Sequence, residues 1–260
     1  MIKVPNMKQL RLEIVEDCIA LLTINRPEKM NSLNMDCFHD LSAFADFLND
    51  CQEIRAGVII GEGKAFAAGI EAGEIKGDEY FFENVLKDAL AKLEYCRKPT
   101  IAAINGYALG GGFELALSCD IRILSEKAVI SFPECGLGII PGAGGLQRLV
   151  HIAGLGVAKE MVLTGRRLDA EQSYSKGLGM CVVPAEKLLD EALETARNIA
   201  KQGPIALTLA KRVLDLAVGV DKHTGLIMED WAVYLCKKTA DSVEGKQALI
   251  EKRKPNFTGS

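Results

Sequence analysis

The stretch IAAINGYALGGGFELALSCD, residues 101–120, carries the most informative pattern in the chain. An apolar segment typical of a strand runs into Gly106, and three glycines at 110–112 precede a helical pattern that contains Glu114. Glycine lets the backbone approach a ligand without an intervening Cβ atom, and the N–H groups at a helix N-terminus carry partial positive charge. The stretch therefore predicts an anion-binding turn or, alternatively, a tight packing corner between a strand and a helix.

The same order of elements recurs on both sides of this stretch. Apolar strand patterns are followed by glycine-bearing loops and then by helical patterns, with the loops at 61–69, 106–112 and 136–145. Strands that alternate with helices predict an α/β fold built from repeated turns. Strand patterns end near residue 186, and the remaining chain has helical periodicity. We therefore expect a core over residues 1–195 and a helical region over residues 196–260.

Composition excludes several classes of protein. The 260 residues include 25 glycines, are 48% hydrophobic and carry a net charge of −4, which argues against a nucleic-acid partner. Eight cysteines without a C-x-x-C motif and only three histidines give no expectation of a metal site. Asn105 and Glu114 interrupt the longest apolar stretch, so no membrane partner is expected. The first residues lack the pattern of a signal peptide, and we expect a cytoplasmic protein.

Two nucleotide-binding templates fail against the glycine-rich segments. The segment GEGK at 61–64 lacks the spacing of a phosphate-binding P-loop. The segment GAGGLQ at 142–147 has Gln147 where a dinucleotide fingerprint needs glycine or alanine. The sequence also contains no G-x-S-x-G or H-E-x-x-H motif, so these hydrolase and zinc-protease templates are excluded.

A second loop and a second carboxylate give the central stretch a possible chemistry. The segment KAFAAGIE at 64–71 also leaves a strand through small residues, and it can supply a second backbone N–H for an oxyanion. Glu134 lies at a strand end in SFPECGLGIIPGAGGLQRL, residues 131–149. If Glu114 and Glu134 face one pocket, they form the pair of carboxylates that acid and base roles need.

These motifs resemble the crotonase superfamily, and specifically enoyl-CoA hydratase. The resemblance extends from Asn25-Arg26-Pro27 through FAAGI, NGYALGGGFELALSCD and FPECGLGIIPGAGGLQRL to TGRRLDA and KRKPNF. It implies an α/β crotonase-like spiral of repeated ββα turns with a helical C-terminal region that builds homotrimers or hexamers. The implied substrate is a coenzyme A thioester. No permanently bound cofactor is implied, because coenzyme A enters as part of the substrate.

The resemblance also implies a role for individual residues. The backbone N–H groups of Ile70 and Gly111 would hold the thioester oxygen. Glu114 would deprotonate a water at C3 of a 2-enoyl group, and Glu134 would give a proton to C2. The implied binding residues for coenzyme A and substrate are Arg26, Lys29, Met30, Ala68, Gly69, Ile70, Glu71 and Gly142.

The first loop departs from the common hydratase form, in which Ala-Gly is followed by Ala-Asp. Ile70 and Glu71 occupy those two positions here. The alternatives within the superfamily are an enoyl-CoA isomerase that uses Glu134 alone and a hydratase or hydrolase of cyclic acyl-CoAs. The alternative outside enzymes is an RNA-binding or scaffolding protein of the same fold, which the net charge and the two glutamates disfavour.

Overall fold

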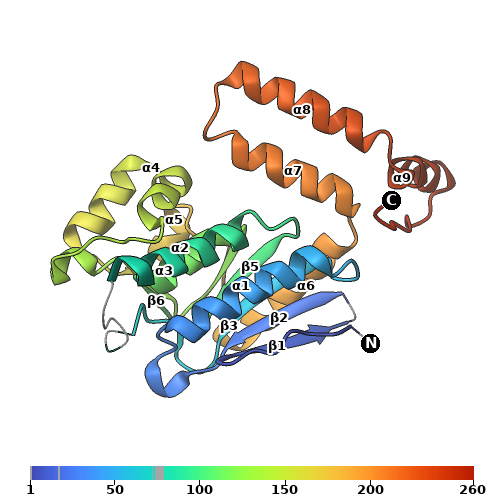
Figure 1. The fold of residues 1–260 in the computed structure, drawn as a ribbon. Coiled ribbons are helices and arrows are strands. Elements are labelled where there is room, and N and C mark those ends of the chain that lie inside the picture. The colour runs from blue at the N-terminus through green and yellow to red at the C-terminus, as the bar shows by residue number, and fades with distance from the viewer. Residues whose placement is uncertain (1, 17, 72, 74–78) are drawn as a thin grey trace.

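The chain folds into two β-sheets with helices packed around them (Figure 1). The computed structural model describes residues 2–16, 18–71, 73 and 79–260. Within these residues, the larger sheet has the strand order β1-β2-β3-β5-β7-β10 and the smaller has the order β4-β6-β8-β9. The strands span Leu10–Val15 (β1), Ile19–Ile24 (β2), Ala56–Gly61 (β3), Ala65–Ala67 (β4), Thr100–Ile104 (β5), Tyr107–Leu109 (β6), Ile121–Ser125 (β7), Val129–Ser131 (β8), Leu168–Asp169 (β9) and Val182–Val183 (β10).

Helices follow the strands in a regular order and then continue alone to the end of the chain. The α-helices span Met35–Asp50 (α1), Glu79–Glu94 (α2), Gly111–Ser118 (α3), Gly145–Thr164 (α4), Ala170–Ser175 (α5), Leu188–Ala200 (α6), Pro204–Leu216 (α7), Lys222–Cys236 (α8) and Ala240–Glu251 (α9). Short 3₁₀ helices span Pro27–Lys29 (η1), Glu134–Leu137 (η3) and Ala185–Lys187 (η4). No helix in the described ranges is long and apolar enough to cross a membrane.

The repeated unit is a pair of strands followed by a helix. In β3-β4-α2, β5-β6-α3 and β7-β8-α4, the first strand joins the larger sheet and the second joins the smaller one. Strands β3, β5 and β7 pair in parallel, as do β4, β6 and β8, so each unit repeats the path of the one before it. The expected α/β spiral of ββα turns is therefore confirmed.

Two hydrophobic clusters cover the two faces of the larger sheet. Helices α1, α2 and α3 pack on one face, and α6 packs on the other. Alternate residues of each strand reach opposite clusters, as with Leu22 and Leu21 of β2. The expected division at residue 196 falls within α6, where Ala196 is buried against the sheet. Gly203, between α6 and α7, is the point where the chain leaves the core.

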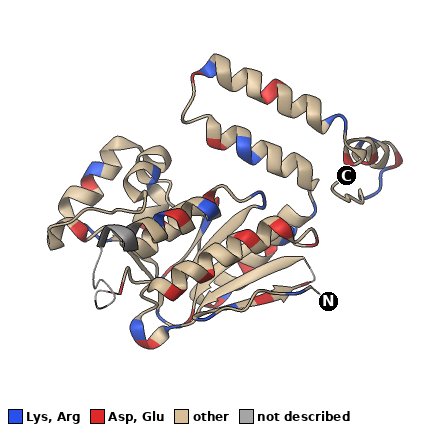
Figure 2. Cartoon of the chain, viewed as in Figure 1, with Lys and Arg blue, Asp and Glu red and all other residues tan. Residues whose placement is uncertain are grey.

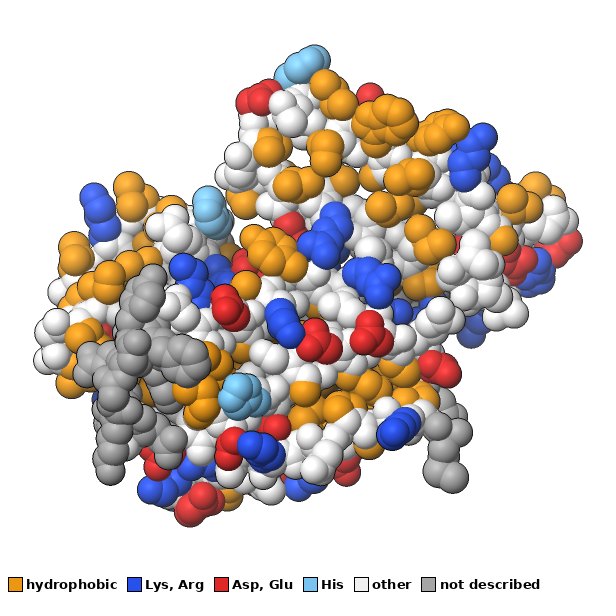
Figure 3. Space-filling view, viewed as in Figure 1, with side chains coloured by type: hydrophobic (Ala, Val, Ile, Leu, Met, Phe, Trp, Pro, Cys, Tyr) orange, Lys and Arg blue, Asp and Glu red, His pale blue; other side chains and the backbone are white. Residues whose placement is uncertain are grey.

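The last three helices form an arm that projects from the body (Figure 1). In Figure 2, most of α7 and α8 is tan, the colour of residues other than Lys, Arg, Asp and Glu. Figure 3 shows apolar side chains gathered on this arm. The large exposed apolar side chains of α7 to α9 are Leu214, Leu216, Leu226, Ile227, Met228, Trp231, Val233, Tyr234, Leu235, Val243, Leu249 and Ile250. An apolar surface of this kind is typical of an interface with another protein chain.

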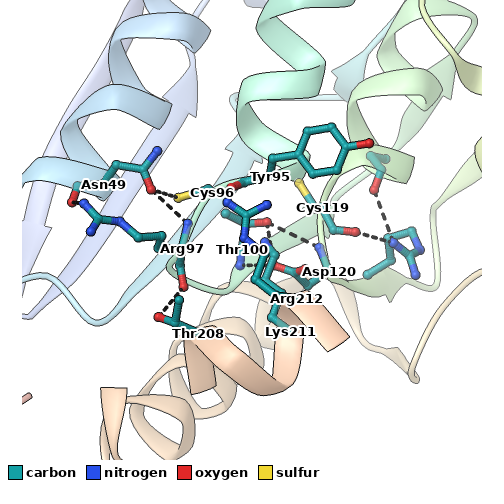
Figure 4. A network of polar contacts seen from close by, with 12 residues as sticks. Asn49, Tyr95, Cys96, Arg97, Thr100, Cys119, Asp120, Thr208, Lys211 and Arg212 are labelled. Carbon is teal, nitrogen blue, oxygen red and sulfur yellow. Dashed lines mark hydrogen bonds and ion pairs between the residues drawn. The ribbon is translucent and has the colours of Figure 1, made fainter. Parts of the chain in front are cut away.

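Polar contacts fasten α7 to the body (Figure 4). The Lys211 ammonium lies 2.8 Å from an Asp120 carboxylate oxygen, and that oxygen also accepts a hydrogen bond from the Thr100 N–H at 2.7 Å. The Arg212 guanidinium donates to the carbonyl oxygen of Tyr95 at 2.6 Å. A cavity of about 1060 Å³ lies between α7 and the body, and neither Glu114 nor Glu134 lines it. The two predicted catalytic residues therefore lie apart from this cavity.

Candidate active site

Glu114 is held inside the protein at the first turn of α3. Gly112 lets this turn press against β4, because a methyl group there would collide with the backbone of Ala67. The Glu114 residue is 2% exposed, and its Oε1 accepts hydrogen bonds from the N–H groups of Ala143 at 2.8 Å and Gly145 at 2.9 Å. Two N–H donors aimed at one carboxylate stabilise its ionised form.

The loop that carries these donors is itself braced. Gly144 has a left-handed φ of 93°, and a Cβ at this position would lie 2.7 Å from Nη1 of Arg148. Arg148 Nη1 donates to the Ala143 carbonyl oxygen at 2.7 Å, and its Nη2 lies 2.7 Å from the Glu94 carboxylate. Arg148 therefore holds the peptide group that lies between the two N–H donors of Glu114.

Glu134 occupies a different environment at the start of η3. The side chain is partly buried, and its Oε2 has no hydrogen-bond partner among the described residues. Burial raises the pKa of Glu134 to about 7, and the negative charge of Glu114 contributes in the same direction. Glu134 is thus a carboxyl group whose protonated form is favoured near neutral pH.

Gly110 brings the two carboxylates toward the same turn. It has a φ of 52° and precedes α3 directly, so it lies four residues before Glu114. A methyl group at Gly110 would collide with Oε1 of Glu134. Only glycine adopts this backbone conformation and leaves room for the carboxyl group. The expected pairing of the two glutamates at the N-terminus of α3 therefore has a geometric basis.

Ile70 and Gly111, the residues expected to form an oxyanion hole, lie side by side. A Cβ built on Gly111 would be 3.0 Å from Cγ1 of Ile70. Within the described part of the chain, neither the Ile70 N–H nor the Gly111 N–H donates a hydrogen bond. An oxyanion hole requires two convergent N–H donors without acceptors of their own, so the prediction for Ile70 and Gly111 is compatible with their placement.

The residues expected to bind coenzyme A come from three segments, which are the turn around η1, the first loop and the loop before α4. Met30 accepts a hydrogen bond from the Ala68 N–H at 3.1 Å, so the turn after η1 touches the first loop. Lys29 extends into solvent, with its side chain 55% exposed, whereas the Arg26 side chain is only 10% exposed. Gly142 is exposed in the loop before α4, and Gly69 has a left-handed φ of 95°.

Comparison with known proteins identifies the family. The model of the enoyl-CoA hydratase/isomerase family matches residues 15–260. The chain belongs to this family, within the crotonase superfamily. It is 40% identical over 243 residues to a probable enoyl-CoA hydratase of Mycobacterium tuberculosis, covering 92% of this chain and 94% of that protein. It is 38% identical over 244 residues to a short-chain-enoyl-CoA hydratase of Clostridium acetobutylicum, with the same shares covered.

A solved structure of the same family closely matches the fold. The crystal structure of an enoyl-CoA hydratase from Bacillus anthracis superposes with a TM-score of 0.95 at 38% identity, covering 97% of this chain and all of that one. Membership of the enoyl-CoA hydratase/isomerase family, expected from the sequence motifs, is therefore confirmed. The family acts on acyl-CoA thioesters, and the chain is an enzyme of this family.

The sequence motifs left out two parts of the site. Ala143 and Gly145, whose N–H groups hold Glu114, lie beside the predicted Gly142 but were not themselves expected to contribute. Arg148 was also missed, because nothing in a helical pattern reveals that its guanidinium turns back to the preceding loop. The three glycines at 142, 144 and 145 were the available signal that this loop approaches another group closely.

Proposed function

We propose that the protein is an enoyl-CoA hydratase, which adds water reversibly and syn across the C2–C3 double bond of a 2-enoyl-CoA to give a 3-hydroxyacyl-CoA. One observation carries the proposal. Glu134 lies against Gly110, four residues before Glu114, and the two glutamates have opposite surroundings: Glu114 accepts two N–H hydrogen bonds, whereas the pKa of Glu134 is raised to about 7. A pair of carboxyl groups with separated proton affinities provides one base and one acid at neutral pH.

In the proposed mechanism, the Ile70 and Gly111 N–H groups bind the thioester oxygen. Glu114 removes a proton from water as the water oxygen bonds to C3. The electron pair of the double bond moves onto the thioester, and the resulting enolate oxygen is stabilised by the two N–H groups. Glu134 then donates its proton to C2, and the carbonyl re-forms. Glu114 ends protonated and Glu134 ionised, and proton exchange with solvent restores the starting state.

The proposed binding site for the coenzyme A part of the substrate is the region around η1 and the first loop. Lys29 is the exposed cation of this region, and cations attract the phosphates of the coenzyme. The backbone at Met30, Ala68, Gly69 and Gly142 would line the path from the phosphates to the thioester. Arg26 and Glu71, which were also expected to bind the coenzyme, form an ion pair with each other beside this site. No further cofactor or metal enters the proposed reaction.

We also propose that the enzyme works as a homotrimer or a hexamer built from two trimers. The exposed apolar side chains of α7 to α9 support this assembly, because an apolar surface in water is stabilised by burial against another chain. Light scattering coupled to size-exclusion chromatography measures the mass, and a monomer would contradict the proposal. The cytoplasmic location and the absence of a nucleic-acid partner remain predictions from the sequence.

The test of the function uses crotonyl-CoA, the shortest common 2-enoyl thioester, with the variants Glu114→Gln and Glu134→Gln. Loss of the conjugated enoyl absorbance follows hydration. Each substitution keeps the shape of the side chain and removes its proton transfer, which lowers kcat by about 10²–10⁴-fold. Glu13→Gln is the control, since Glu13 is an exposed residue of β1.

Product analysis separates the alternatives. Undiminished hydration by either active-site variant contradicts the assignment of that glutamate. Conversion of a 3-enoyl-CoA to a 2-enoyl-CoA by Glu114→Gln, with no hydration by the unmodified enzyme, would instead identify an isomerase that uses Glu134 alone. A screen with branched and cyclic acyl-CoAs tests for a specialised hydratase or hydrolase. Binding of RNA without any turnover would indicate the non-enzymatic alternative.

A further inference from the structure

Glu71 directly follows Ile70 and ties the first loop to the turn around η1. Its Oε2 lies 2.6 Å from Nη2 of Arg26, and its Oε1 lies 3.1 Å from Nζ of Lys29. The hydrogen bonds from Arg26 and Lys29, in that order, lower the pKa of Glu71. Glu71 is therefore ionised at neutral pH and bridges two cations on the neighbouring turn.

Both terminal nitrogens of Arg26 are used within the protein. Nη2 contacts Glu71, and Nη1 donates to the carbonyl oxygen of Ser32 at 2.5 Å. A planar guanidinium that makes two such bonds is fixed in orientation. The Arg26 side chain is only 10% exposed, so it links two segments inside the protein. Of the two cations that contact Glu71, Lys29 is the one that reaches solvent.

The turn that carries Arg26 is anchored to the body by Asn31. The Asn31 side chain is fully buried, and its Nδ2 donates to the carbonyl oxygens of Glu62 at 2.9 Å and Ala65 at 2.6 Å. Its Oδ1 accepts from the Arg26 N–H at 2.9 Å. A continuous series of hydrogen bonds therefore links Glu62 and Ala65, at the end of β3 and the start of β4, through Asn31 and Arg26 to the Glu71 carboxylate.

The direction of the Ile70 N–H follows from this anchoring. The Leu33 N–H donates to the Gly69 carbonyl at 2.8 Å, and the Glu71 N–H donates to the Leu33 carbonyl at 2.9 Å. In extended backbone, successive peptide groups alternate in direction, so the Ile70 N–H points away from Leu33. The Ile70 side chain meanwhile packs at Gly111, whose N–H is the second proposed donor.

We propose that Glu71, held by Arg26, is a positioning residue that directs the Ile70 N–H at the thioester oxygen, and that Arg26 does not bind the coenzyme A phosphates. The inference rests on the proposed hydratase function. Without the ion pair, the two backbone hydrogen bonds to Leu33 alone would define the direction of the donor. Misplacement of a catalytic group by about 1 Å costs on the order of 10²-fold in rate.

The experiment compares Glu71→Gln and Arg26→Gln with Glu16→Gln. Glu16 also forms an ion pair with an arginine, Arg197, but on an exposed surface away from the site. Three quantities are measured: kcat for crotonyl-CoA, Kd for free coenzyme A, and the absorption maximum of a bound cinnamoyl-CoA with an electron-donating ring substituent. That absorption shifts to longer wavelength as the thioester carbonyl is polarised, so it reports on the oxyanion hole without turnover.

We expect Glu71→Gln and Arg26→Gln to lower kcat about 10- to 100-fold and to reduce the absorption shift, with Kd for coenzyme A unchanged within about twofold. The conservative variants Glu71→Asp and Arg26→Lys keep the charges and should retain part of both signals. These two conservative variants provide the test if the glutamine variants fail to fold. Glu16→Gln should match the unmodified enzyme in all three measurements.

Other results overturn the proposal. A tenfold or larger rise in Kd for coenzyme A in Arg26→Gln, with kcat and the absorption shift preserved, would make Arg26 a phosphate ligand. Unchanged kcat and shift in Glu71→Asp and Arg26→Lys, with the glutamine variants unfolded, would leave the ion pair a purely structural role. If the unmodified enzyme hydrates no enoyl-CoA but shifts the bound chromophore, and the variants lose that shift, the proposed function fails while the positioning role stands.

Discussion

Glu114 and Glu134 are the same residue type in two contrasting surroundings. The Glu114 carboxylate accepts two backbone N–H hydrogen bonds from the loop before α4. Glu134, on η3, has a buried oxygen without a partner in the described residues, and burial raises its pKa to about 7. The surroundings of each carboxyl group, and not its chemical identity, distinguish the proposed base from the proposed acid.

Glycines next to each carboxyl group contribute to the difference between the surroundings of Glu114 and Glu134. At Gly110 the missing Cβ leaves space for the Glu134 carboxyl group, and at Gly145 it leaves space for the Glu114 side chain. The loop peptide groups can donate to Glu114 because the backbone at Gly144 is left-handed. A methyl group at any of these positions would therefore alter one carboxyl group while leaving the other in place.

The largest effect should come from Gly110→Ala. Its methyl group would collide with Glu134 Oε1, and the φ of 52° disfavours any residue with a Cβ. We expect kcat for hydration to fall about 100-fold or more, because Glu134 must move from C2. The measurement is steady-state hydration, normalised to the folded fraction from circular dichroism.

Gly136→Ala is the matched control for this prediction. Gly136 lies in the same 3₁₀ helix as Glu134, and a Cβ there would meet no atom within 4 Å. Its kcat should stay within about twofold of the unmodified enzyme. Equal losses in the two alanine variants would show that the surroundings of Glu134 tolerate no change at all, and the specific role of Gly110 would be abandoned.

The pH profile tests the acid side of the comparison. Because the pKa of Glu134 is raised from 4.5 to about 7, the acid is protonated below this pH and loses its proton above it. We expect kcat/KM for hydration to fall about tenfold for each pH unit above 7. Dehydration should have the same profile, since the two starting forms of the glutamate pair carry the same number of protons. Constant kcat/KM up to pH 9 would contradict the assignment of the acid.

Arg148→Lys tests the base side. Lysine keeps the charge but has no planar fork to contact both the Ala143 carbonyl and Glu94. The loop should then hold the Glu114 carboxylate less firmly, and we expect kcat to fall about tenfold. The alkaline limb of the pH profile near pH 7, which belongs to Glu134, should stay in place.

Arg212→Lys is the control for this substitution, because Arg212 contacts the Tyr95 carbonyl at the base of the arm. It should change neither limb of the profile. A shift of the alkaline limb in Arg148→Lys would mean that Arg148 also affects the pKa of Glu134. The surroundings of the two glutamates would then not be independent, contrary to what the hydrogen bonds indicate.

The repeating fold could be predicted because its determinants are local. Each apolar strand ends in a glycine-bearing loop that precedes a helix, and the three ββα units follow from that order. The placement of α6 could not be predicted in the same way. Its helical stripe was evident, but its burial against the sheet depends on how Ala192 and Ala196 fit onto distant strands.

In the candidate site, too, local features could be predicted from the sequence, whereas features that depend on distant contacts could not. The motifs around Glu114 and Glu134 gave both positions, whereas their opposite surroundings depend on partners far along the chain. Ala143 lies 29 residues from Glu114, and the Arg26 side chain contacts Glu71, which is 45 residues away. Sequence periodicity carries no information about such pairings. The family resemblance implied that Arg26 binds coenzyme A, but it did not indicate the partner of Arg26 in the protein.

Asp120 is a partly buried carboxylate outside the candidate site, and changing its partner gives the smallest expected effect on catalysis. Asp120 lies just after the end of α3, whereas Glu114 lies in the first turn of that helix. Asp120 is paired with Lys211, which is 7% exposed. In Lys211→Met the Asp120 charge keeps only its hydrogen bonds to Thr100, so the free energy of unfolding should fall by about 1–3 kcal/mol. Because Lys211 contacts neither of the proposed catalytic glutamates, kcat of the folded enzyme should stay within about twofold. Urea denaturation measures the first quantity and hydration of crotonyl-CoA the second. A large loss of kcat with unchanged stability would instead mean that the ion pair between Asp120 and Lys211 acts on the candidate site, and that Asp120 is coupled to the two glutamates proposed to transfer protons.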